Sequence, residues 1–285
     1  MIFGEEDVMD KAIIFGIYDF VSFHIGSTLL NKGLEVIGID IDNLEETGNV
    51  EEKRLEIGRN ANFNEISLSK LDGYKLEDTV KTTLFVSLYD LYMLNRETIL
   101  QTESVRKSLQ QFIDNNHVTE IVSILPIQHL NTEPDAVLQW LRSAPIECQF
   151  VYLPAVYGPW QPPTFSFQQA LLARFEETEI MANKREWTGD ILFIDDAVEA
   201  ILEIIDESGL RSNYILIESG IEDYWIQCAA KLKLNGSLTE SVRPEPVLID
   251  QTIKRVTVKN VTPFPESIKK QLDLLYRINL NNAEQ

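Results

Sequence analysis

Two apolar runs joined by an amphipathic segment near the start of the chain constrain the fold more than any other feature. Residues Lys11 to Ile17 and Leu34 to Ile41 each read as a short buried strand. Between them, Phe20 to Lys32 have helical spacing and stop at Gly33, a residue that commonly ends helices. A strand, a helix and a second strand within about 30 residues predict a βαβ unit with two parallel strands.

The alternation continues along the chain. Further buried strands are predicted at 62–68, 82–88, 119–125 and 148–153, with helices at 96–116 and 134–142. Such alternation is typical of the α/β class, and predicts a Rossmann-like, doubly wound parallel sheet. Later elements are shorter, with helices expected at 165–182, 195–206, 222–232 and 265–277 and strands at 190–194, 214–217 and 256–261. We therefore expect a Rossmann-like dinucleotide-binding-type domain over residues 1–160. A small mixed C-terminal lobe over 161–285 should complete the sheet and cover its ligand edge.

The loop after the first strand is where such a fold binds the pyrophosphate of a dinucleotide. This loop usually has three glycines, for the tight turn, for approach of the phosphates and for packing of helix on strand. Here Gly16 is present, but Asp19 and Ser22 stand at the second and third positions. A carboxylate beside a phosphate costs free energy on the order of kcal/mol. Asp19 is also a good residue to cap the following helix, and we expect its side chain to occupy the anion site.

Asp40 ends the second predicted strand, where an acid can hydrogen-bond the adenosine ribose of a dinucleotide. This position favours NAD over NADP, if a dinucleotide binds. The alternative is a solvated acid beside Asp42 with no ligand role. Gly16, Asp19, Ser22 and Asp40 are therefore the candidate cofactor-binding residues, and NAD is the possible cofactor.

Composition argues against several classes of function. The 285 residues have a formal net charge of -20, and a uniformly acidic surface repels nucleic acid. No apolar run approaches the roughly 18 residues of a membrane span, and the acidic N-terminus does not resemble a signal peptide. Cys148, Cys228 and the three histidines match no metal or redox spacing. We expect a cytoplasmic protein with buried free thiols, no metal site, and neither a nucleic-acid nor a membrane partner.

Four short motifs of the chain, taken in sequence order, resemble the motifs of one protein family. The segment DFVSFH, from Asp19 to His24, resembles G-F-I-G-S-H, and LLNKGLEVIGID, which ends at Asp40, matches L-L-x-x-G-x-x-V-x-G-x-D. Further on, VYGP, from Val156 to Pro159, resembles N-V-Y-G-P, and GDILFIDD, from Gly189 to Asp196, resembles R-D-F-V-Y-V-D-D. These motifs are similar to those of the extended short-chain dehydrogenase/reductase family, the NAD-dependent sugar-nucleotide epimerases and dehydratases. The resemblance spans residues 11 to about 207 and implies the family's fold.

The resemblance also implies a chemistry, hydride exchange between NAD and a sugar hydroxyl, for which the family uses a Tyr as acid/base and a Lys four residues later. No Tyr of this chain has a Lys at that spacing; Tyr92 has Arg96 there, but it lies too early in the chain. Gly189 replaces the family's diphosphate-binding Arg, for which Arg185 or Arg174 could stand in. We therefore assign no catalytic residue.

Three residues are candidates for a substrate cleft because of their place in the family pattern. Ser123 lies near the family's Ser/Thr position, although its segment, IVSILP, also reads as strand core. Tyr157 belongs to the VYGP motif. Trp160 follows that motif, whose turn overhangs the active site in the family. The alternative for Trp160 is core or lid packing.

Two functions of different classes follow. The first is a non-catalytic relative of the epimerases and dehydratases, a pseudoenzyme that keeps the scaffold to bind an unknown protein partner or small ligand. It is supported by the missing second and third glycines, Tyr/Lys pair and diphosphate Arg. The alternative is an NAD-binding epimerase, dehydratase or reductase with substituted catalytic residues, which Asp40 and the VYGP turn favour. Because family members commonly dimerise through the helices after the fourth and fifth strands, a homodimer is a further hypothesis.

Overall fold

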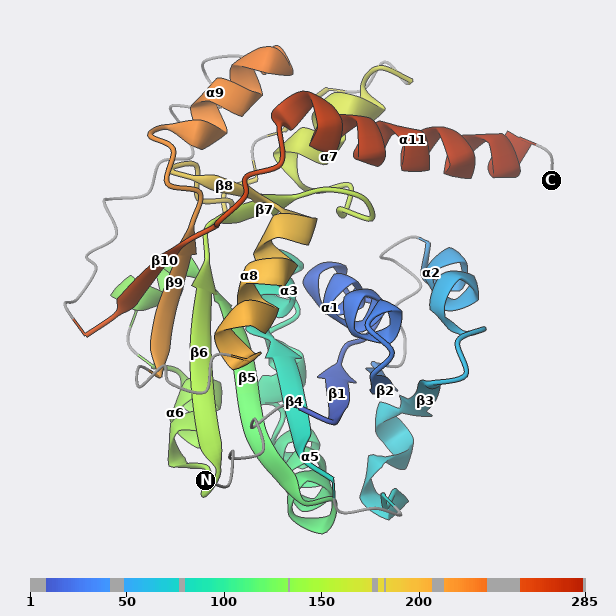
Figure 1. The fold of residues 1–285 in the computed structure, drawn as a ribbon, viewed down its shortest axis with the longest axis vertical. Helices are drawn as coiled ribbons and strands as arrows, with labels where there is room; N and C mark the ends of the chain where they lie inside the picture. Colours follow the sequence, from blue (N-terminus) through green and yellow to red (C-terminus); the bar gives the residue numbers. More distant parts are fainter. Residues whose placement is uncertain are drawn as a thin grey trace, which may run out of the picture.

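The computed structural model describes residues 9–41, 49–76, 80–132, 134–175, 179–181, 183–206, 213–234 and 252–283. Within these residues the main sheet has eight strands in the order β10-β9-β6-β5-β4-β1-β2-β3 (Figure 1). All its strand pairs are parallel, which confirms the predicted Rossmann-like α/β class. The strands are β1 (Lys11–Phe15), β2 (Glu35–Asp40), β3 (Phe63–Ser67), β4 (Thr82–Ser87), β5 (Val118–Pro126), β6 (Glu147–Leu153), β9 (Tyr214–Glu218) and β10 (Lys254–Thr257).

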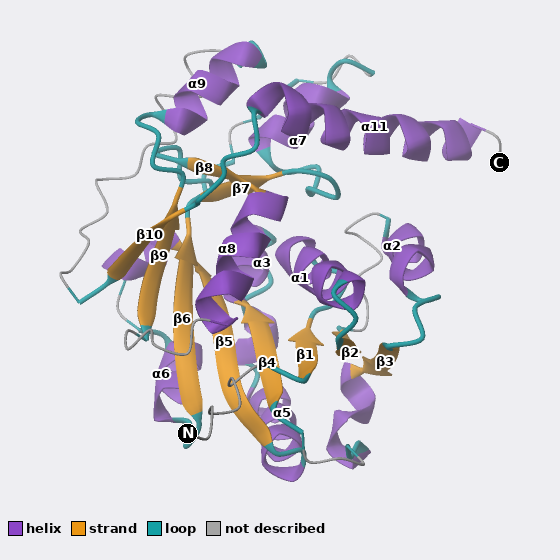
Figure 2. Cartoon of the chain, in the orientation of Figure 1, coloured by secondary structure: helices purple, strands orange, loops and turns teal. Residues whose placement is uncertain are grey.

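Helices cover both faces of the sheet (Figure 2). One face carries α1 (Phe20–Asn31) and α8 (Ile194–Asp206), and the other carries α5 (Glu103–Asn115) and α6 (Ala136–Ser143). Alternate residues of β1 point to opposite faces, so that Ala12 and Ile14 pack in the core with α1 and α8, whereas Ile13 and Phe15 pack with α5 and α6. Burial on both faces explains why central strands such as β1 and β5 are almost continuously apolar.

A smaller group of elements lies over the carboxyl ends of the strands (Figure 1). Its two-stranded parallel sheet pairs β7 (Ala155–Tyr157) with β8 (Ile191–Phe193). Around it lie α7 (Ser166–Leu172), α9 (Tyr224–Lys231) and α11 (Phe264–Ala283). The segment after residue 160 also supplies β9 and β10 to the main sheet, so it builds both the lobe and one edge of the sheet.

Some elements differ from those expected. The helix expected at 96–116 is two helices, α4 (Thr98–Gln101) and α5, because the backbone of Thr102 between them is extended. The helix expected at 165–182 ends as α7 at Leu172. A short helix that was not predicted, α3 (Leu88–Met93), starts directly after β4 with no intervening turn. Other short elements are α2 (Val50–Ile57), η2 (Leu68–Gly73) and η3 (Ile127–Asn131).

Several expectations concern absences and free thiols. Cys148 and Cys228 are free and buried, as predicted. In the described part of the chain, no helix is long and apolar enough to cross a membrane. Residues 1–8, which make up most of the acidic N-terminal stretch, lie outside the described residues, and so does Asp42.

Candidate functional site at the carboxyl edge of the sheet

Gly16 makes the tight turn between β1 and α1. Its φ is +69°, and a Cβ added to it would lie 2.7 Å from Oδ2 of Asp19 and 3.0 Å from Cδ1 of Ile41. The amides of Gly16 and Ile17 both donate to the carbonyl oxygen of Ile39, at 3.0 and 3.2 Å, which fixes the turn to β2. Both the backbone conformation and the close neighbours therefore require glycine here.

Asp19 stands at the N-cap position of α1 but does not cap the helix with its side chain. Its backbone is extended, and its carboxylate accepts no hydrogen bond from the amides of α1. The carboxylate instead forms an ion pair with Arg96, and the two side chains are only 3% and 16% exposed. The expectation that the Asp19 side chain caps α1 is therefore wrong: its carboxylate lies beside the Gly16 turn, pairs with Arg96 and leaves the amides of α1 to another group.

A different carboxylate binds the amides at the start of α1. Both oxygens of Asp90 lie 3.0 Å from the amide nitrogen of Val21, and Oδ2 also accepts from the amide of Ser22 at 3.1 Å. Asp90 belongs to α3 and is almost completely buried. Its own amide donates to Oγ of Ser87 at 3.1 Å. Since a helix N-terminus favours a bound anion, the anion site of this turn is occupied by the protein's own side chain.

A buried cation and a partly buried one accompany these acids. Lys53, from α2, donates from Nζ to the carbonyl oxygen of Tyr18 at 2.7 Å. Arg96 lies between α3 and α4, and its Nε and Nη1 are buried without a hydrogen-bond partner. We call Asp19, Lys53, Asp90 and Arg96 the four-charge cluster. Its two acids and two bases bring α1, α2 and the end of α3 together around the glycine turn.

Burial shifts the protonation equilibria of this cluster. It raises the pKa of Asp19 to about 7, an effect that the Arg96 charge opposes and the Asp90 charge increases. It also raises the pKa of Asp90, against the hydrogen bonds from the Val21 and Ser22 amides. The pKa of Lys53 falls to about 8 because its ammonium is desolvated, although Asp19 and Asp90 favour the charged form.

Ser22, at the position of the third glycine, is buried where α1 packs on β1. Its Oγ donates to the carbonyl oxygen of Phe15 at 3.2 Å, and its amide is one of the two that bind Asp90. The hydroxymethyl group is therefore accommodated between helix and strand by a hydrogen bond to the strand's last residue.

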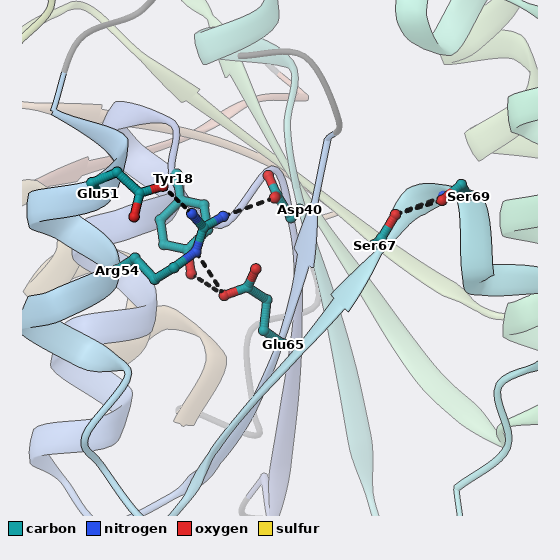
Figure 3. Close-up of polar contacts among 7 residues, drawn as sticks. All are labelled: Tyr18, Asp40, Glu51, Arg54, Glu65, Ser67 and Ser69. Atoms are coloured by element: carbon teal, nitrogen blue, oxygen red, sulfur yellow. Dashed lines mark hydrogen bonds and ion pairs between the residues drawn. The ribbon is translucent and has the colours of Figure 1, made fainter. Parts of the chain in front are cut away.

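Asp40 also has an internal partner (Figure 3). Nη2 of Arg54, from α2, lies 3.1 Å from Oδ2 of Asp40, while Nε donates to Glu65 at 3.2 Å and Nη1 pairs with Glu51. The guanidinium lies 4.9 Å from the ring centroid of Tyr18, whose hydroxyl donates to Glu65. The acid predicted to meet a ribose is thus the end of a charged network between α2, β2 and β3.

The substrate-cleft candidates do not converge on one site. Ser123 lies inside β5, fully buried, with an Oγ that has no hydrogen-bond partner, in the strand core that its segment also suggested. Tyr157, in β7, shares a hydrogen bond with Oγ of Ser267, in α11, at 2.6 Å inside the lobe. Trp160 has a positive φ of 63° and is 8% exposed. It lies at a hollow of about 600 Å³, which His24 and Arg277 also line.

Arg185, one of the two possible substitutes for a diphosphate Arg, also has internal partners. Arg185 donates from Nη1 to the carbonyl oxygen of Tyr92 at 2.6 Å and pairs with Glu97, and its guanidinium lies over the Tyr92 ring. At Gly189, a Cβ would lie 2.3 Å from two ring atoms of Trp187. The Trp187 ring therefore occupies the space that a side chain at position 189 would need.

Another hollow lies beside the lobe. It measures about 570 Å³ and lies between the end of α3 and the segment after β7, with Met93, Thr164, Leu172 and Arg185 among its lining residues. No described group of three or more His, Cys, Asp and Glu residues is arranged to hold a metal ion.

Sequence reasoning missed the residues that decide this site. Asp90 follows the predicted strand 82–88, and an acid directly after a buried strand is a signal that can mark the ligand edge. Lys53, Arg54 and Arg96 carry no such signal, because their partners are distant in the sequence.

Comparison with known proteins gives the fold an independent test. No protein-family model and no curated protein matches the chain. The UDP-glucuronic acid 4-epimerase of Bacillus cereus, solved with UDP-glucuronic acid and NAD, matches with a TM-score of 0.64 at 14% identity, over 94% of this chain and 99% of that one. TunA, an NAD-dependent NDP-hexosamine 5,6-dehydratase of tunicamycin biosynthesis, matches with a TM-score of 0.63 at 14% identity, over 94% and 98%.

A third structure is the dTDP-glucose 4,6-dehydratase of Bacillus anthracis in complex with NAD. It matches with a TM-score of 0.60 at 13% identity, over 95% of this chain and 97% of that one. At such low identity the likeness concerns the fold. The chain therefore has the Rossmann-like α/β fold of the NAD-dependent sugar-nucleotide epimerases and dehydratases, the extended short-chain dehydrogenase/reductase fold that its motifs predict.

Proposed function

We propose that this protein is a non-catalytic relative of the NAD-dependent epimerases and dehydratases, which uses their scaffold to bind a partner or small ligand. The observation that carries the proposal is the Asp90 carboxylate on the Val21 and Ser22 amides. A pyrophosphate and this carboxylate need the same donors. A dinucleotide bound in the usual way would have to displace a buried, charged side chain.

The pairing of the other expected ligand groups supports the same proposal. Arg54 pairs with Asp40, and Glu97 pairs with Arg185. Each of these charges would have to leave its internal partner before it could bind a ribose or a diphosphate. The chain also lacks a Tyr with a Lys four residues later, so no group at the expected place is suited to move the substrate proton.

The hollow of about 570 Å³ beside Arg185 and Met93 is open to a small ligand. Concave sites at the carboxyl edge of a parallel sheet are where such folds commonly bind ligands. We propose this hollow, and not the glycine turn, as the place to look for a small ligand.

The second candidate is an NAD-binding epimerase, dehydratase or reductase with substituted catalytic residues. It is favoured by the solved structures of this fold that contain NAD and are covered almost completely by the match. Asp40 at the end of β2 also favours it, since the side chain stands where an acid can meet a ribose.

Titration with NAD and NADP separates the two candidates. Ligand at about 100 times its dissociation constant stabilises a folded protein by roughly 2.7 kcal/mol, which is several degrees in Tm. We expect no Tm shift for the native chain with either dinucleotide at about 1 mM. Two results together would establish the second candidate instead. One is a Tm shift with NAD that is lost in Asp40→Ala, and the other is measurable hydride exchange between NAD and a hydroxyl of a sugar nucleotide. An exposed acid, Asp114→Ala, is the matched control for the loss of one negative charge.

A further inference from the structure

The carboxylate of Asp90 is placed as a ligand of α1 and not as a surface acid that happens to lie near a helix end. It is almost completely buried, it comes from another element, and it accepts hydrogen bonds from two consecutive backbone amides. Asp90 is itself held by the hydrogen bond between its amide and Ser87. The amides of Val21 and Ser22 therefore have their acceptor within the molecule, and the amide of Phe23 donates to the carbonyl oxygen of Asp19.

The charges around Asp90 make it necessary to the cluster. Asp19 and Asp90 together balance Lys53 and Arg96. Against the effect of burial, the charge of Arg96 lowers the pKa of Asp19, and the charges of Asp19 and Asp90 raise the pKa of Lys53. Without Asp90 the cluster would keep two cations, one acid and the positive end of a helix. A buried excess of positive charge is costly, so an anion should enter the space if one of suitable size is available.

Some donors around this space have no acceptor. Nε and Nη1 of Arg96 are buried with no partner, and Lys53 has three N–H groups of which one donates to the Tyr18 carbonyl. Removal of Asp90 would add the Val21 and Ser22 amides to these unsatisfied donors. The resulting environment suits a small oxyanion with several acceptor atoms.

We propose that Asp90 is a tethered internal ligand, which takes the place of a cofactor phosphate and keeps the N-terminus of α1 closed to phosphate ligands. The tether matters because a ligand carried on the same chain acts at a high effective concentration, in the millimolar range or above. A free phosphate competes poorly against it. This inference extends the proposed function, because it names the contact that makes the chain independent of a dinucleotide.

Chemical rescue tests the inference directly. Asp90→Ala removes one carboxylate, and formate supplies a carboxylate of the same geometry. We expect Asp90→Ala to melt several degrees below the native chain in chloride, and saturating formate to restore at least half of that loss. Inorganic phosphate should also raise the Tm of this variant, and should bind it at least tenfold more tightly than it binds the native chain. Chloride at equal ionic strength is the salt control.

Two control variants isolate the charge from the shape. Asp90→Asn keeps the shape and one acceptor oxygen, so formate should find no space and give no rescue. Asp114→Ala removes an exposed acid of α5 and should respond to formate as the native chain does. Equal responses to formate in all four proteins, or no response in Asp90→Ala, would overturn the inference.

A measurement on the native chain covers the case in which Asp90→Ala does not fold. The amides of Val21 and Ser22 should exchange their hydrogens at least tenfold more slowly than unbonded helix-start amides, since both donate to a buried carboxylate. Exchange at the rate of free amides would overturn the inference. The outcome is separate from the dinucleotide titration: NAD binding by the native chain contradicts the proposed function, whereas absent rescue contradicts only the role of Asp90.

Discussion

The ion pair between Asp19 and Arg96 offers a quantitative test of how the glycine turn is held. Two opposite charges about 4 Å apart interact by about 4 kcal/mol at an effective dielectric constant of 20. The pair is buried, so solvent screens it little. Arg96→Met leaves Asp19 and Asp90 with Lys53 as their remaining cation in the four-charge cluster. Removing one partner of a buried pair costs about 3–5 kcal/mol, and we expect a loss of this size in the free energy of unfolding.

A double-mutant cycle separates the pair from the other effects of each substitution. The four proteins are the native chain, Arg96→Met, Asp19→Asn and the double variant, and urea denaturation gives the free energy of unfolding of each. We expect a coupling of about 2–4 kcal/mol. Asp19→Asn alone should cost less than Arg96→Met, because it also relieves the repulsion between Asp19 and Asp90. A coupling below about 0.5 kcal/mol, the range of exposed pairs, would refute the reasoning.

The same proteins test the protonation of Asp19. Its pKa in the folded chain is raised to about 7 by burial, against about 3.9 in an unfolded chain. Between these values the folded chain binds a proton that the unfolded chain does not, so this group lowers the free energy of unfolding as pH rises through the window. The slope is at most about 1.4 kcal/mol per pH unit. Asp19→Asn should remove it, and the coupling with Arg96 should be larger at pH 8 than at pH 5.5.

Three further substitutions have simple expected outcomes. Gly16→Ala should lower the free energy of unfolding by about 1–2 kcal/mol because of its positive φ, and further because of its close neighbours. The control is Gly33→Ala, which has a φ of +86° and nothing within 4 Å of an added Cβ. Its loss of Tm measures the cost of the backbone conformation alone. Gly189→Ala should cost about 1–3 kcal/mol through overpacking against Trp187, with a change in tryptophan fluorescence; unchanged Tm and emission would contradict the contact. Burial lowers the pKa of His24 to about 4, below the unfolded value of about 6.5. The free energy of unfolding should therefore fall by up to about 3 kcal/mol as pH drops from 6.5 to 4. Urea titrations of His24→Gln at both pH values should lack this pH-dependent loss.

Most of the fold could be predicted because each signal is local. The apolar runs of β1 and β2 and the glycine after α1 require no knowledge of distant residues. The break at Thr102 could not be predicted, since the segment keeps an amphipathic pattern on both sides. Helix α3 was not predicted because it begins directly after β4, so that its first residue continues the apolar pattern of the strand.

The candidate site was predictable in position but not in its contacts. Gly16, Asp19, Ser22 and Asp40 lie at the carboxyl ends of adjacent strands, as the topology requires. Their partners could not be inferred, because Asp90, Arg96 and Arg54 come from other elements and reach the edge only when the chain is folded. Ser123 shows a different limit of prediction from sequence. Its strand was predicted correctly, but its place inside the strand decides whether it faces a ligand.

The contact between Asp90 and the start of α1 affects how the stability of the chain depends on ligand. A protein that binds a cofactor gains stability as RT ln(1 + [L]/Kd), so its folded population depends on ligand concentration. The carboxylate of Asp90 is part of the chain, so this anion is present at every ligand concentration. The glycine turn of this chain should therefore be as ordered in the absence of any dinucleotide as in its presence. On the proposed function, that constancy is what a scaffold that presents a surface or a hollow requires.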